Sequence, residues 1–271
     1  MTSTEILART RNFKELHHVV VSGEGKTSIV LGNGFGTDQT MWQHILPWLE
    51  KRYRVVRFDW LIDPYHYDSS RYSSLPGFVD DLLAVLIATD TPTCLYVGHS
   101  MGGMIGMLAA KQAPERFRAL TMLAPSPCFV NHPGYVGGFE SAEIEQLLHD
   151  LGSDYLSWVD RFSPLAVAQP AGCPNTDEFA RSLRAMRPDV AFSMALTVFK
   201  MDLRDQLDGF THPTTIVQTR DDIAVPMAVP QFLLTHWPQA RLEVIETSGH
   251  FPHLTAPAQL IAILGRTLPQ V

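Results

Sequence analysis

Short apolar runs alternate with longer segments of helical periodicity along most of this chain. Helical patterns, including 78–87 and 101–110, separate most of the runs. This alternation predicts an α/β fold with a mostly parallel central sheet flanked by helices on both faces. The Gly-containing segment 22–25 between the first two runs predicts a β-hairpin there. The runs typical of strands are 18–21, 28–31, 53–58, 94–97, 119–123, 214–218 and 242–245.

Residues 137–202 interrupt this alternation with a series of amphipathic stripes. Apolar residues recur there at spacings of three and four, the period of a helix with one apolar face. Breaks at 152–153, 170–175 and Pro188 divide the segment into four predicted helices. We therefore expect a core formed by 1–136 and 203–271, with 137–202 as an inserted subdomain that either extends the core or covers a site as a lid. The stripes are Ile144, Leu147, Leu148 and Leu151; Tyr155, Trp158, Val159 and Phe162; Phe179, Leu183 and Met186; and Met194, Ala195, Val198 and Phe199.

The composition excludes several classes of protein. The 271 residues carry 21 Lys and Arg against 28 Asp and Glu, so the formal net charge of −7 argues against a nucleic-acid partner. No apolar run approaches the ~20 residues that cross a membrane, and the N-terminus lacks the pattern of a secretory leader. We expect a cytoplasmic protein that does not associate with membranes.

No metal and no organic cofactor is expected. The cysteines Cys94, Cys128 and Cys173 are widely spaced and form no C-x-x-C pair, so their spacing predicts neither a zinc site nor a disulfide framework. The Gly-rich segment 32–36 lacks the Lys-Ser/Thr of a phosphate-binding loop and predicts no nucleotide site.

The strongest chemical signal is the sequence Gly-His-Ser-Met-Gly at 98–102, which fits G-x-S-x-G. An apolar strand runs into it and a helix of small and apolar residues runs out of it, which is the context that this motif requires. We expect Ser100 at the carboxyl end of the sheet, beside a helix N-terminus that favours developing negative charge. The pattern predicts a nucleophile, and a Gly-rich turn with an idle serine is the plain alternative.

A serine hydroxyl needs a general base, which on folds with this motif follows the acid along the chain. His250 lies in a loop after the last predicted strand and is the predicted base. The nearby His253 is the competitor, and we expect it to support the loop. We expect His99, next to the serine, to be structural or to line a pocket. The histidines expected at the surface are His17, His18, His44 and His149.

The acid that orients this base is expected after the strand 214–218, where Asp221 and Asp222 are adjacent. The residues alone do not separate the two. Asp59 ends an earlier strand and is expected to cap or pair locally. Asp80 and Asp81 lie on a helix whose polar face is expected in solvent.

Acyl transfer also needs two backbone N–H groups that bind the negative oxygen of the intermediate. One would come from Met101, directly after the nucleophile. The other would come from Phe35, in the loop 32–36 that follows the strand 28–31. The ring of Phe35 would then form a wall of the substrate pocket.

Taken together, these motifs resemble one subfamily of α/β-hydrolases: the plant strigolactone receptor-hydrolases, the karrikin receptors and the related bacterial stress-signalling hydrolase. The similar segments include NGFGTDQTMW, GHSMGG, PSPCFVN, YLSWV, PLAVAQP, MRPD, TVFKMDLR, QTRDDIAVP and GHFPHL. The resemblance implies an α/β-hydrolase fold with a four-helix lid over a deep apolar pocket. Its pattern Q-T-x-x-D-x-x-V-P places the acid at Asp222, and it supports Ser100, His250, Phe35 and Met101 in the roles given above. The matching pocket positions are His99, Phe129, Trp158, Phe162, Val198 and Phe199.

Some residues depart from the plant members of this subfamily. Asn33 stands where those proteins commonly have histidine, Arg161 stands where the receptors have glycine on the lid, and the loop 60–72 is shorter. Tyr65, His66 and Tyr67 in that loop are expected to alter the pocket mouth. These departures argue against docking of the plant signalling partner and leave the triad intact.

The sequence thus predicts a serine hydrolase that cleaves an apolar carboxylic ester or lactone; the resemblance implies a strigolactone-like butenolide as one substrate. A slow-turnover small-molecule receptor or signalling module with a protein partner, using the same pocket, is the alternative. Carbon–carbon bond hydrolysis and cofactor-free perhydrolysis can use the same triad. A haloalkane dehalogenase would need aspartate in place of Ser100.

Overall fold

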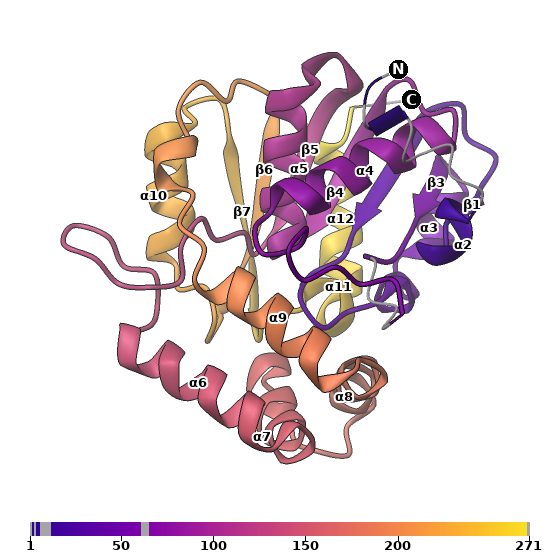
Figure 1. The fold of residues 1–271 in the computed structure, drawn as a ribbon. Coiled ribbons are helices and arrows are strands. Elements are labelled where there is room, and N and C mark those ends of the chain that lie inside the picture. Colours follow the sequence, from indigo (N-terminus) through magenta and orange to yellow (C-terminus); the bar gives the residue numbers. More distant parts are fainter. Residues whose placement is uncertain (1, 3, 6–11, 61–64, 270–271) are drawn as a thin grey trace.

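A seven-stranded sheet forms the centre of the molecule (Figure 1). The computed structural model describes residues 2, 4–5, 12–60 and 65–269. The strands lie in the order β1-β3-β2-β4-β5-β6-β7, and each neighbouring pair is parallel except β1 with β3. This sheet confirms the predicted α/β class. The bounds are β1 Val20–Ser22, β2 Ser28–Gly32, β3 Arg54–Arg57, β4 Cys94–His99, β5 Phe117–Leu123, β6 Thr214–Asp221 and β7 Arg241–Ser248.

The predicted hairpin between the first two strands is wrong. β1 pairs antiparallel with β3, with Val21 opposite Val56, while β2 lies between β3 and β4. Gly23, at φ +79°, and Gly25 pass so close to the backbone of residues 50–53 that a β-carbon at either position would clash with it. The glycines therefore permit this close approach and do not form a tight turn between paired strands.

Helices cover both faces of the sheet. Outside the connection between β5 and β6, the described elements are α2 Phe13–Leu16, η1 Gln39–Trp42, α3 Leu46–Glu50, α4 Pro76–Ala88, α5 Met101–Gln112, η2 Pro114–Arg116, α10 Ala228–His236, α11 Pro252–Thr255 and α12 Pro257–Thr267. Alternate strand residues face opposite sides and build two apolar cores. In β4, Tyr96 shares a core with α4 and α5, whereas Leu95 and Val97 share the other core with α3 and α12. None of the described helices is long and apolar enough to cross a membrane.

Four helices occupy the long connection between β5 and β6: α6 Ser141–Ser153, α7 Tyr155–Val167, α8 Pro174–Ala185 and α9 Pro188–Phe199. The short helix η3 Arg204–Gln206 follows them. The Asp154 carboxylate accepts from the Ser157 N–H at the start of α7, and prolines occupy the first turns of α8 and α9. Figure 1 shows these helices gathered at the end of the molecule opposite to the two termini. They lie beside the carboxyl ends of the parallel strands, where ligand sites of such sheets are found.

Candidate active site

Ser100 lies at the sharp turn between β4 and α5. Its backbone has φ 51° and ψ −120°, a conformation that residues with a side chain rarely adopt. A β-carbon on Gly98 would lie 2.6 Å from the carbonyl oxygen of Gly102, and one on Gly102 would lie 2.6 Å from that of Gly32. The Ser100 N–H donates to the Leu123 carbonyl at 2.8 Å, which fixes the turn against β5. The two glycines therefore permit a strained turn that presents the serine at the end of the strand.

His250 and Asp222 form a buried, hydrogen-bonded pair. Nδ1 of His250 lies 2.7 Å from Oδ2 of Asp222. The same carboxylate oxygen accepts from Nε2 of Gln218 at 3.1 Å, while Oδ1 accepts from the N–H groups of Ala224 at 2.8 Å and Val225 at 3.1 Å. A carboxylate that accepts these bonds requires Nδ1 to carry the ring proton, which leaves a lone pair on Nε2. The pair therefore has the arrangement of a general base oriented by an acid.

The adjacent Asp221 takes no part in this pair. Its side chain is exposed, and its Oδ2 accepts from the Ser248 hydroxyl at 3.3 Å. The two neighbouring carboxylates that the residues alone leave unresolved thus have different surroundings, and only Asp222 contacts the imidazole.

Expectations for two other titratable residues are wrong. Asp81, expected in solvent, is buried and accepts from Oη of Tyr72 at 2.7 Å and Nη2 of Arg71 at 2.6 Å. His17, expected at the surface, is buried beside it, and its Nδ1 lies 2.9 Å from the backbone carbonyl of Asp59. Burial lowers the pKa of His17, although the charge of Asp81 opposes this shift. Contacts with other parts of the chain bury Asp81 and His17, and neither residue lines the cavity described below.

The loop that carries His250 is fastened to helix α7. The His250 N–H donates to the Ala166 carbonyl at 2.8 Å. Gly249, at φ +96°, lies so close to the Val167 carbonyl that a β-carbon there would clash with it. From the other side, Nε2 of His99 donates to the His250 carbonyl at 2.9 Å. The base is therefore held both by the strand that ends at the nucleophile and by the helical insertion.

Two further histidines, His99 and His253, lie buried next to His250. The ring centroids of His99 are 4.9 Å from those of His250 and 4.7 Å from those of His253, and His253 stacks on Trp42. Burial, reinforced by the charges of His253 and His250, holds the pKa of His99 well below its ordinary value. Burial and the nearby His250 lower the pKa of His253 to about 3. Both rings are therefore neutral near pH 7 and place no positive charge beside the base.

The loop after β2 brings backbone amides next to the serine. A β-carbon on Gly34 would lie 3.3 Å from Cβ of Ser100, so the loop passes directly beside the nucleophile. Asn33 anchors the loop through hydrogen bonds of its buried side-chain amide. No hydrogen bond joins the N–H of Phe35 or Met101 to another part of the described chain. Both amides thus lack a hydrogen-bond partner among the described residues.

Ser100 and His250 line a narrow apolar cavity of about 150 Å³. Leu165 and Ile223 are more than half exposed and mark its mouth. Walls of this kind favour an apolar ligand with one reactive polar group near the serine. The lining consists of Phe35, His99, Ser100, Phe129, Phe139, Leu147, Phe162, Leu165, Ala166, Phe179, Val198, Phe199, Ile223, Ala224, His250 and Phe251.

The cavity includes most of the pocket residues expected from sequence. Trp158 is the exception, because its ring lies one layer back, stacked on Phe162 at 4.4 Å between centroids and edge-on to Phe35 at 6.4 Å. A helical period places Trp158 and Phe162 on one stripe and cannot tell which of them reaches the cavity. The expected residues found in the lining are Phe35, His99, Phe129, Phe162, Val198 and Phe199. The sequence did not predict the other lining residues, although two of them, Leu147 and Phe179, belong to the predicted apolar stripes of the inserted helices.

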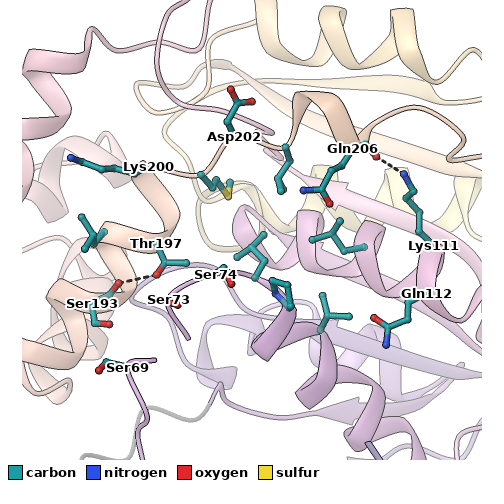
Figure 2. Close-up of a pocket in the computed structure, with 17 residues that line it drawn as sticks. Ser69, Ser73, Ser74, Lys111, Gln112, Ser193, Thr197, Lys200, Asp202 and Gln206 are labelled. Carbon is teal, nitrogen blue, oxygen red and sulfur yellow. Dashed lines mark hydrogen bonds between the residues drawn. The ribbon is translucent and has the colours of Figure 1, made fainter. Parts of the chain in front are cut away.

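A larger cavity, of about 1040 Å³, lies between α4, α5 and α9 (Figure 2). Its lining includes Ser73, Ser74, Lys111 and Thr197 but neither Ser100 nor His250. Lys111 there donates to backbone carbonyls of the segment after α9. Of these two cavities the smaller one is therefore the candidate site, because Ser100 and His250 line it.

The described residues that are expected to depart from the plant subfamily do not belong to the cavity lining. Oη of Tyr67 donates to Oγ of Ser193 on α9 at 3.0 Å, and neither Tyr65 nor His66 lines the cavity. Residues 61–64 of the loop that is expected to be shorter lie outside the described residues. Arg161 is exposed on α7, with its guanidinium 3.9 Å from the Asp150 carboxylate.

Comparisons with known proteins agree with the observed fold. Residues 27–257 match the family described as alpha/beta hydrolase fold. The chain is 41% identical over 258 residues to karrikin insensitive 2 receptor IA of Petunia hybrida, covering 93% of this chain and 94% of that protein. It is 40% identical over 264 residues to strigolactone esterase D14 of Arabidopsis thaliana, covering 96% and 98%. A solved hydrolase structure, olei00960 from Oleispira antarctica, is 31% identical, with a TM-score of 0.88 over 94% of this chain and 97% of that one.

Proposed function

This chain belongs to the α/β hydrolase family, and from that membership we propose that it is a serine hydrolase that cleaves a small, apolar carboxylic ester or lactone through an acyl-enzyme. The observation that carries the proposal is the 2.7 Å contact between His250 and Asp222, at a cavity that Ser100 also lines. We propose that Ser100, His250 and Asp222, from three separate loops, act as the nucleophile, the base and the acid.

In the first half of the reaction, Nε2 of His250 takes the proton of Ser100 as Oγ attacks the substrate carbonyl. Asp222 holds the imidazole in the tautomer that makes Nε2 the acceptor, and it stabilises the imidazolium that forms. The N–H groups of Phe35 and Met101 stabilise the negative oxygen of the tetrahedral intermediate. The imidazolium then donates its proton to the departing alkoxide, and the acyl group stays on Ser100.

In the second half, His250 removes a proton from water, which attacks the acyl-enzyme and releases the acid. With a lactone, the alcohol and the acid are parts of one molecule, so the alcohol leaves the site only after this step. The reaction as proposed requires no metal and no organic cofactor, because its proton transfers and charge stabilisation come from side chains and backbone amides.

The cavity volume of about 150 Å³ limits the part of the substrate next to Ser100. A cavity of this size holds a group of about the size of benzene. A five-membered lactone ring or a short acyl chain therefore fits beside the nucleophile, and a larger group extends through the mouth between Leu165 and Ile223. The relatives named for strigolactone and karrikin support a butenolide as one substrate.

Residues 137–202 act as a lid in this proposal, and 1–136 with 203–271 form the catalytic core. Side chains from each of the four inserted helices line the cavity, among them Leu147, Phe162, Phe179 and Phe199. Substrate entry would therefore depend on movement of these helices or of the side chains at the mouth. We propose a cytoplasmic protein whose ligand is a small molecule.

A fluorophosphonate that reacts with activated serines tests the mechanism. We expect the wild-type protein to gain the mass of one phosphonyl group, located to Ser100 by peptide mapping, and to lose hydrolysis of p-nitrophenyl acetate at the same rate. The Ser100→Ala protein should remain unmodified and inactive. A folded wild-type protein that stays unlabelled would refute the proposed nucleophile.

A slow-turnover receptor that signals to a protein partner is the second candidate, and one contact favours it. The His250 N–H donates to the Ala166 carbonyl of α7, so a covalent or bound ligand at the base can be sensed by the insertion. Steady multiple turnover of a butenolide ester supports the enzyme. A single burst, followed by a long-lived adduct on His250 or Ser100 and a change in protease sensitivity of 137–202, supports the receptor.

A further inference from the structure

The two connections between the core and the inserted helices meet at one point outside the candidate active site. Cys128, on the segment that enters the insertion, pairs antiparallel with Asp202, on the segment that leaves it. His132 lies in the same entering segment. A cysteine sulfur, an imidazole nitrogen and a carboxylate oxygen of these three residues all lie within 4.8 Å of one another.

The surroundings of this trio leave room for an ion. The three side chains line a hollow of about 280 Å³ that is also bordered by Glu145 of α6 and by Lys200. Figure 2 shows Asp202 pointing away from the neighbouring cavity of Ser73, Ser74 and Thr197, which the same segment borders. The hollow and that cavity share Lys200, Met201 and Asp202 in their linings, and the hollow is open to solvent because His132 and Asp202 are exposed.

We propose that Cys128, His132 and Asp202 form a zinc-binding site that joins the two ends of the helical insertion. Thiolate, imidazole and carboxylate are the ligands that Zn²⁺ takes in proteins, at about 2.3, 2.0 and 2.1 Å respectively. A tetrahedron with these bond lengths has edges of about 3.3–3.6 Å. The ligand atoms therefore need to approach by about 1 Å, which the two exposed side chains can do by rotation, and water completes the fourth position.

The backbone of the entering segment already holds the ligands in place. The Cys128 carbonyl accepts from Oγ of Ser126 at 2.8 Å and from Oη of Tyr135 at 2.7 Å. The His132 N–H and carbonyl both bond to the backbone of Tyr135, at 3.0 and 2.9 Å. The thiol itself makes only a weak contact, 3.5 Å from the Val130 carbonyl, so a metal displaces little when it binds. The backbone of this segment therefore needs little further ordering when a metal binds.

Two features oppose binding and set its strength. Arg204 donates to both oxygens of Asp202, at 2.9 and 2.6 Å, and must share that carboxylate with the metal. Burial raises the pKa of the Cys128 thiol, so Zn²⁺ has to displace its proton, which passes to the buffer. Both features weaken the site relative to a structural zinc centre, and they favour a metal that binds reversibly rather than one on which folding depends.

Cobalt(II) added alone to the reduced protein tests this assignment, because Co²⁺ takes the same ligands and bonding to a thiolate produces a charge-transfer absorption. We expect the wild-type protein to develop this band at about one cobalt per chain and to lose it on addition of Zn²⁺. Cys128→Ser should abolish the band, whereas Cys173→Ser, at a half-exposed cysteine on another part of the insertion, should retain it.

His132 is exposed, so its substitution provides a second variant that leaves the protein core unchanged. His132→Ala should weaken Zn²⁺ binding, measured by competition with cobalt, by about tenfold or more. It should also remove any zinc-dependent rise in melting temperature. Fluorophosphonate labelling of Ser100 reports whether each variant is folded, independently of metal. A wild-type protein without the charge-transfer band, or a band that survives Cys128→Ser, would overturn the proposal.

Discussion

Replacing Asp222 by asparagine tests the assignment of the acid most directly, because the structure fixes how the new side chain must lie. The two backbone N–H groups of Ala224 and Val225 donate to Oδ1, so that position needs an acceptor. An asparagine at this position therefore places its carbonyl oxygen there and its NH₂ group at the Oδ2 position. The NH₂ then faces Nδ1 of His250 and Nε2 of Gln218, both of which donate to that position in the native protein.

The consequence for catalysis follows from the tautomer. An NH₂ group beside Nδ1 of His250 requires that nitrogen to accept, so the ring proton moves to Nε2 and the base loses the lone pair that faces the serine. Nε2 of Gln218 keeps its bond to the Val225 carbonyl but loses the one to residue 222, and the unpaired N–H costs about 1–3 kcal/mol of stability at a buried site. We expect kcat to fall about 10³- to 10⁴-fold, as when the acid of such a triad is replaced.

Hydrolysis of p-nitrophenyl acetate by purified Asp222→Asn, with urea unfolding to confirm the native state, measures both effects. Asp221→Asn is the matched control, because that carboxylate is exposed and bonds only to Ser248 among the described residues. The control should retain activity within about twofold, in keeping with surface substitutions. Equal losses in the two variants, or an active Asp222→Asn protein, would refute the reasoning from the tautomer.

Three other predictions concern the supports of the site. Gly249→Ala should lower the free energy of unfolding by about 1–3 kcal/mol, because a β-carbon at φ +96° clashes with the Val167 carbonyl. It should also lower kcat about 10- to 100-fold, and a native-like kcat in a folded variant would contradict this. His253→Phe should make the free energy of unfolding fall less steeply as the pH is lowered. In wild type, His253 of the unfolded chain binds a proton below pH 6.5, whereas the pKa of the folded ring is about 3. The wild-type protein therefore loses up to about 1.4 kcal/mol of unfolding free energy per pH unit in that window. Urea unfolding at about pH 7.5 and about pH 5 measures the difference between the two proteins, and parallel losses would exclude it. Phe129→Ala should lower stability by about 3–5 kcal/mol and raise the ratio of kcat/KM for p-nitrophenyl butyrate over acetate; an unchanged ratio would remove Phe129 from the substrate wall.

Elements with a strong local signal could be predicted from the sequence. Apolar runs bounded by helical patterns predict the parallel strands, because a strand covered on both faces must be apolar throughout. The serine turn is local too, since Gly98 and Gly102 provide for a strained backbone within five residues. The chain order of nucleophile, acid and base then narrows the partners to one histidine loop and two adjacent aspartates.

Features that depend on contacts distant in sequence could not be predicted in this way. The glycines at 22–25 look the same whether they form a hairpin or pass close to residues 50–53. The helical pattern predicts a solvent-exposed Asp81, but in the folded protein Arg71 and Tyr72 bury its carboxylate and donate hydrogen bonds to it. Trp158 shares a stripe with Phe162, and only packing separates the residue in the cavity wall from the one behind it.

The contact between the insertion and the base connects both proposed roles of this protein. His250 takes its tautomer from the core, through Asp222, but the position of its backbone depends on α7, through the Ala166 carbonyl. A displacement of α7 that breaks this bond would leave the imidazole paired with its acid yet free to shift relative to Ser100. In the proposed mechanism a shift of about 1 Å costs about 10²-fold in rate, so α7, which lines the cavity, would also control whether the proposed triad is competent. The two proposed roles would then depend on the same helix, and the rate of turnover, not the architecture, would distinguish them.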